Sequence, residues 1–196
     1  MSSKRLKIFS VLVGLLLIAE GISLFHRPAP TKSVPTEFAS TKSAPTESAS
    51  DSYTFPQTLQ GLALSQSTAG PQAVSMINKL HGSNIKVKQG YIGQYDGSAG
   101  QIIVWVSESN NTDEARQLFD IMDRRIISAA QNAGSAGGAP PFTDRRTISH
   151  SGVSVIAVKG MGMENYYYQI DSKVYWVAVV GVNPVKTLDE FMKTTK

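Results

Sequence analysis

The residues best suited to contact another molecule lie between positions 160 and 176. Two glycines open this stretch, polar residues follow at 164 and 165, and three tyrosines stand at 166–168. Because side chains alternate along a strand, Tyr166 and Tyr168 share one face while Tyr167 takes the other. An aromatic ring with a polar group suits binding of a peptide, a glycan or another protein. The candidate binding residues are therefore Glu164, Asn165, Tyr166, Tyr168 and Trp176.

A structural role is the alternative for the same aromatic residues. One face of the strand would then pack in the core, and the other would be ordinary sheet surface. The next strand carries Tyr175 and Trp176, which would lie beside the tyrosines across a turn in either case. Core packing needs fewer assumptions, and a binding patch is kept as the second interpretation.

Catalytic and metal-binding motifs offer little further guidance. The chain has no cysteine, which excludes disulfides, thiol catalysis, cysteine ligands and a lipoprotein anchor. Its three histidines lack metal-ligand spacing, and no Gly-x-Ser-x-Gly, Ser-x-x-Lys or His-Glu-x-x-His motif occurs. We therefore expect no cofactor and no metal. The enzymatic alternative is a hydrolase-type site of unfamiliar design, built from Glu164, Tyr166, Tyr168 and His150.

Residues 8–25 form an almost wholly apolar run of eighteen residues behind three basic residues. A helix of this length rises about 27 Å, close to the roughly 30 Å hydrocarbon core of a bilayer. Basic residues before the run predict a cytoplasmic N-terminus, so residues 1–27 are expected to be a cytoplasmic tip and a single-pass anchor in membrane lipid. A signal peptide cleaved near Ala19-Glu20-Gly21 is the alternative, and it would release a secreted protein.

Residues 28–52 are rich in Pro, Ser and Thr and contain a tandem duplication. The segment 31–40 (TKSVPTEFAS) and the segment 41–50 (TKSAPTESAS) match at eight of ten positions. Such a repeat has too few apolar residues to bury a core, so we expect a disordered stalk. At about 3 Å per residue, the stalk would hold a domain up to roughly 75 Å from the membrane.

Residues 53–196 are long enough for one domain with its own core. They carry thirteen basic and eleven acidic residues, so the net charge of this domain is only +2. A nucleic-acid-binding domain would show a basic footprint, which is missing here, so no nucleic-acid partner is expected.

Hydrophobic periodicity and turn residues divide the domain into elements. Asn111 and Glu114 form a capping-box pattern at the start of a helix with one apolar stripe. The expected elements are a short strand at 59–64, a helix at 71–81, strands at 85–95 and 101–107, a helix from Asn111, a loop at 133–141, strands at 146–150, 153–159, 166–170 and 174–180, and a closing helix at 187–195.

This order predicts an α+β fold rather than a doubly wound parallel sheet. Two main helices would cover one face of an antiparallel sheet, with the strand at 101–107 in its centre. For function, we expect a membrane-anchored extracytoplasmic domain that binds a protein, peptide or glycan without catalysis. The enzymatic site and the secreted form remain the alternatives.

Overall fold

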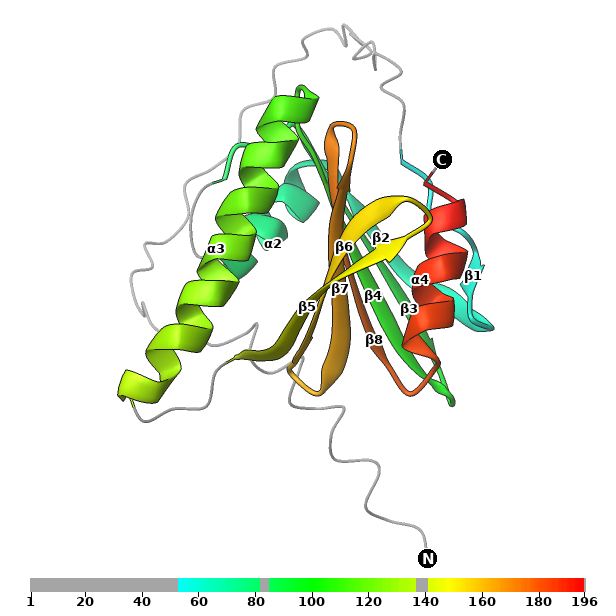
Figure 1. Ribbon diagram of the computed structural model, residues 1–196. Coiled ribbons are helices and arrows are strands. Elements are labelled where there is room, and N and C mark those ends of the chain that lie inside the picture. The colour runs from blue at the N-terminus through cyan, green and yellow to red at the C-terminus, as the bar shows by residue number, and fades with distance from the viewer. Residues whose placement is uncertain (1–52, 82–84, 137–140, 196) are drawn as a thin grey trace, which may run out of the picture. The chain divides into compact units, whose positions relative to one another are not determined.

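The computed structural model describes residues 53–81, 85–136 and 141–195. They form an α+β domain, as the sequence predicts, in which an antiparallel sheet of eight strands is packed by three helices (Figure 1). The elements are β1 (Thr58–Leu59), β2 (Leu62–Ala69), α2 (Gly70–His81), β3 (Gln89–Gly97), β4 (Gly100–Glu108), α3 (Thr112–Ala136), β5 (Phe142–His150), β6 (Val153–Gly160), β7 (Met163–Ile170), β8 (Lys173–Val180) and α4 (Pro184–Lys193).

The transmembrane helix expected at 8–25 and the stalk expected at 28–52 lie outside the described residues. Within the described residues, no helix combines the length and the apolar character needed to cross a membrane.

The strands lie in the order β1-β2-β3-β4-β8-β7-β6-β5, and every neighbouring pair is antiparallel. The four C-terminal strands form the predicted meander. Strand β4 lies inside the sheet, between β3 and β8, which confirms its expected central position. The meander therefore joins the N-terminal strands through a single pairing, in which Trp105 lies opposite Trp176.

Both faces of the sheet are covered. Helices α2 and α3 pack on one face, where α3 contacts Tyr167 and Val174, and α2 contacts Ile92. Helix α4 and the chain leading into β1 pack on the other face, where Phe191 lies beside Tyr175. The two main helices thus share one face as predicted, and the short closing helix covers the opposite face (Figure 1).

Two glycines in β3 allow close packing on opposite faces of this strand. A Cβ atom on Gly90 would lie 2.9 Å from the backbone nitrogen of Val74 in α2. A Cβ atom on Gly93 would lie 2.9 Å from the ring of Phe55, on the other face. Because real Cβ contacts are longer, these positions let α2 and the N-terminal segment approach the strand backbone.

Helix α3 begins where the capping pattern predicts. The Asn111 side chain accepts a hydrogen bond from the backbone N–H of Glu114 at 2.9 Å. The Glu114 carboxylate accepts from the backbone of Asn110 rather than from the cap residue itself. At its other end the helix continues to Ala136, so the loop expected from Ala133 is wrong for its first four residues. Alanine favours helix, which accounts for the extra turn.

Candidate functional site

The tyrosines that the sequence singles out lie in the core. Tyr166 and Tyr168 are 1% and 0% exposed, on the face that α4 covers. The ring of Tyr168 stacks on that of Tyr175 with centroids 5.0 Å apart. Burial raises the pKa of Tyr175 to about 12, as a shielded phenol requires. These rings stabilise the sheet, and a ligand at the surface does not reach them.

Asn165 and Trp176 lie on the opposite face, beneath α3. Asn165 is 1% exposed, and its side-chain nitrogen donates to the carbonyl oxygens of Gly160 and Met163 at 3.2 and 3.0 Å. Its oxygen accepts from the indole Nε1 of Trp176 at 3.0 Å. Asn165 therefore links the β6–β7 turn to Trp176. Its side-chain nitrogen and oxygen and the indole N–H all have hydrogen-bond partners, as buried polar groups require.

The third tyrosine of the run joins β7 to α3 and β5. The Tyr167 hydroxyl donates to Asp123 at 2.7 Å, and the same carboxylate accepts two hydrogen bonds of 2.8 Å from Arg145. The Tyr167 ring stacks on Trp176, with centroids 5.0 Å apart and planes 8° from parallel. Burial alone would raise the pKa of Asp123, but hydrogen bonds from Arg145 and Tyr167 outweigh it and lower that pKa.

Glu164 lies at the exposed end of the predicted group and belongs to a cluster of four charges. Arg146 of β5 donates to Glu164 at 2.7 Å, and Lys159 of β6 donates to Asp144 at 2.8 Å. The hydrogen bond and charge of Lys159 hold the pKa of Asp144 below its usual value. We call these four residues the charge cluster; its two cations and two carboxylates balance.

A β-bulge makes this arrangement possible. Thr143 pairs with Lys159 and Arg146 pairs with Ala157, so β5 holds one residue more than β6 over this interval. Asp144, at the bulge, takes a left-handed conformation with φ of 53°. The bulge places Asp144 beside Lys159, while the adjacent Arg145 and Arg146 point to opposite faces of the sheet, as neighbours in a strand do, and pair with Asp123 and Glu164.

The charge cluster borders a pocket of about 400 Å³ at the β6–β7 turn, hereafter the turn pocket. This volume matches that of small-ligand sites, but the turn pocket is an open depression rather than an enclosed cavity. Its lining combines apolar and charged groups from three strands and the turn between two of them: Pro141, Thr143, Lys159, Met161, Met163 and Glu164.

Met161, at the rim of the turn pocket, is held in an unfavourable conformation. It is 63% exposed and has φ of 54°, and Gly162 follows with φ of 74°. Left-handed backbone costs a residue with a Cβ about 1 to 2 kcal/mol. The matching turn positions before Gly61 and Gly152 carry Gln60 and Ser151, which are polar. Met161 exposes a large apolar side chain at this turn position. A polar residue would form the same turn equally well.

The residues of the hydrolase hypothesis are not brought together. His150 pairs with Val153 at the far end of β6, whereas Glu164 pairs with Lys159, six residues away and thus about 20 Å along the strand. His150 Nε2 instead lies 3.4 Å from Asp189 of α4. In the part of the chain that the structure describes, no group of three His, Asp or Glu side chains is placed to hold a metal ion.

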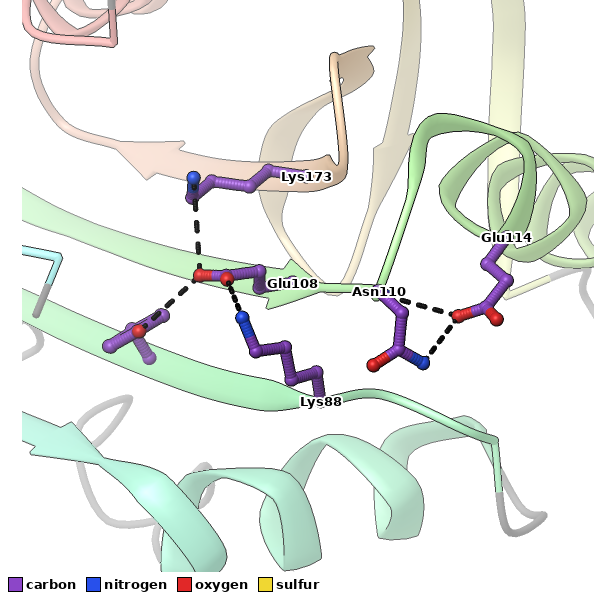
Figure 2. Close-up of polar contacts among 6 residues, drawn as sticks. Lys88, Glu108, Asn110, Glu114 and Lys173 are labelled. Carbon is purple, nitrogen blue, oxygen red and sulfur yellow. Dashed lines mark hydrogen bonds and ion pairs between the residues drawn. The ribbon is translucent and has the colours of Figure 1, made fainter. Parts of the chain in front are cut away.

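A second polar cluster lies at the opposite end of the sheet. Figure 2 shows the Glu108 carboxylate between Lys88 and Lys173, at 3.2 and 3.9 Å. The Tyr91 hydroxyl is 3.5 Å from the same carboxylate. Burial and the charge of Glu108 raise the pKa of Tyr91. These contacts link β3, β4 and β8 at this end of the sheet.

Comparison with known proteins gave no match: no protein-family model, no curated protein and no solved structure is significantly similar to this chain. The class of this protein is therefore defined by its fold and its site. It is an α+β domain with a charged pocket at one edge of an eight-stranded sheet.

Sequence reasoning missed most of the residues around the turn pocket. Of the predicted set, only Glu164 lines it. Lys159 gave no signal because its partner, Asp144, lies on another strand. Met161 did give one, since a methionine between two glycines at a hairpin turn is unusual.

Proposed function

We propose that this protein is a non-catalytic binding module, held outside the membrane by the helix at 8–25 and the stalk at 28–52. Its binding site is the turn pocket, and its partner is another polypeptide. One observation carries the proposal: Met161 is exposed in a left-handed turn at the mouth of a pocket whose lining also includes the charged Lys159 and Glu164. The left-handed backbone belongs to the hairpin turn, as it does at Gln60 and Ser151, so the feature that folding does not require is the exposed methionine side chain.

The turn pocket suits binding rather than reaction. Arg146 and Lys159 each donate to a carboxylate at 2.7 to 2.8 Å. Each positive charge is thereby paired with a negative one. The hydrogen bond that Arg146 donates to Glu164 raises the pKa of Arg146, and the one that Lys159 donates to Asp144 raises the pKa of Lys159. Because these charges are already paired, they disfavour a charged side chain of the partner. An apolar side chain can instead pack against Met161 and Met163.

Photo-crosslinking tests this site in cells that produce the full chain. Benzoylphenylalanine replaces Met161 in one variant and Ser151 in the other, two exposed residues that occupy the same position in X-Gly turns at opposite ends of β6. We expect a crosslinked partner from position 161 alone. Thr143→Arg, which fills the turn pocket, should abolish the adduct, while Thr58→Arg on β1 should not. Equal adducts from both turns, or no effect of Thr143→Arg, would refute the proposal.

Cysteine labelling tests the location. The natural chain has no cysteine, so Ser151→Cys and Ser2→Cys each introduce a single thiol. A membrane-impermeant maleimide should label position 151 in intact cells and position 2 only after lysis. A chain in the medium that lacks position 2 would establish the secreted form, and a thiol at 151 protected until lysis would refute an external domain.

A further inference from the structure

Strand β5 has an open edge beside the turn pocket. It is the last strand of the sheet and pairs only with β6 (Figure 1). Among the described residues, no backbone hydrogen bond joins β5 to any other element. All five residues from 143 to 147 are exposed. In an edge strand, alternate N–H and C=O groups point away from the sheet, ready to pair with another strand.

The open edge consists of two parts with different character. Residues 144 and 145 carry the bulge and two charges, which are the usual protection against strand addition. From Arg146 to His150 the pairing with β6 is regular. Residues 147–150 (TISH) contain no proline, no glycine and no Asp, Glu, Lys or Arg. This second part is therefore free to accept a strand.

The two parts meet the turn pocket in a fixed order. Pro141 and Thr143, which line the pocket, come just before the bulge, and the regular segment comes just after it. A chain that pairs with residues 146–150 and continues past the bulge would pass along the mouth of the pocket. One of its side chains would then reach the turn pocket, which Met161 and Met163 line.

Charge decides which side chains fit this path. The charge cluster is neutral as a whole, and Arg145 is paired with Asp123 at 2.8 Å. A charged residue on the partner would lose part of its hydration here and could gain an opposite charge only by displacing one of these pairs. An uncharged segment needs no such exchange and gains backbone hydrogen bonds together with burial of one apolar side chain.

We infer that the partner binds as an extended, uncharged polypeptide strand, paired with residues 146–150 and with one apolar side chain in the turn pocket. This inference rests on the proposed function and specifies its ligand. Main-chain pairing provides the affinity, while the pocket selects the side chain and fixes the register of the added strand.

The test uses the full chain in non-ionic micelles and a capped synthetic peptide, acetyl-Thr-Val-Thr-Leu-Thr-Val-Thr-amide, as the probe. A second peptide carries N-methyl groups at the alternate residues whose N–H groups would face β5, which removes the donors of the proposed pairing and keeps every side chain. A third peptide has Glu in place of Leu. Binding is followed by NMR titration, and hydrogen exchange of the amides of residues 146–150 is measured in the free and bound states.

We expect the first peptide to slow exchange in residues 146–150 and to shift the Met161 methyl resonance. The N-methylated peptide and the Glu peptide should each bind about tenfold more weakly. Equal binding of the N-methylated peptide would overturn strand addition while leaving side-chain binding at the turn pocket. No slowing of exchange with the first peptide would also overturn the inference, whereas the crosslinking at position 161 judges the proposed function independently.

Discussion

Replacement of Tyr167 by Phe removes one hydroxyl and leaves the ring that stacks on Trp176. That hydroxyl donates to the ionised carboxylate of Asp123 at 2.7 Å. A hydrogen bond to a charged acceptor contributes about 1.5 to 3 kcal/mol, and the Asp123 side chain is only 18% exposed. We expect a loss of about 2 kcal/mol in the free energy of unfolding at neutral pH.

Tyr95→Phe is the matched control. The Tyr95 hydroxyl donates to the carbonyl of Pro56 at 3.0 Å, so the same substitution removes a bond to a neutral acceptor. Tyr95→Phe should lower the free energy of unfolding by about 1 kcal/mol, and this loss should not depend on pH. Both residues are fully buried, which makes the two losses comparable.

The two variants should differ in their pH dependence. Asp123 has a lowered pKa in the folded state, so its contribution is fully present above the unfolded value of about 3.9 and is lost as pH falls through the folded value. The effect of Tyr167→Phe should therefore shrink in acid toward that of Tyr95→Phe. Urea unfolding at about pH 7 and pH 3, followed by tryptophan fluorescence, measures both. A Tyr167→Phe loss that stays constant with pH would refute the charged-acceptor argument.

Three further substitutions test the packing around the site, each by thermal unfolding. Gly160→Ala should destabilise the domain by about 2 kcal/mol, because its Cβ would lie 2.3 Å from the Phe142 ring and 2.5 Å from a backbone oxygen. Asn165→Ala should cost about 3 kcal/mol, since it leaves the indole N–H of Trp176 unpaired and removes two hydrogen bonds to the carbonyls of Gly160 and Met163. Asn183→Ala, which removes the N-cap of α4, should cost about 1 kcal/mol. An unchanged melting temperature would contradict the respective contact.

Local patterns in the sequence predicted much of the fold. Strand alternation placed Tyr167 opposite Tyr166 and Tyr168, and the structure confirms this division. The Asn111 cap and the meander follow from turn and capping chemistry that acts over a few residues. The single strand predicted at 59–64 was wrong: it spans the β1–β2 turn at Gln60-Gly61, and it misses the second half of β2, which is polar and mostly exposed beside β3. A half-exposed polar strand lacks the apolar alternation on which such predictions depend.

The site was harder to predict because it is assembled across strands. Glu164 and Arg146 are eighteen positions apart in the chain and meet only because β5, β6 and β7 pair in one register. The bulge that sets this register has no sequence signal of its own, since Asp144 stands in a run of polar residues. The aromatic run drew attention instead, although burial makes it structural.

The extra residue in β5 also limits self-association. Without Asp144, Thr143 could still pair with Lys159 and Arg146 with Ala157, and Arg145 would fill the single position between them. The edge would then be straight and regular over its whole length, a template on which identical molecules stack into aggregates. The inserted Asp144 thus interrupts the regular edge and shortens the segment on which another strand could add. A shorter segment of this kind disfavours aggregation at high protein concentration.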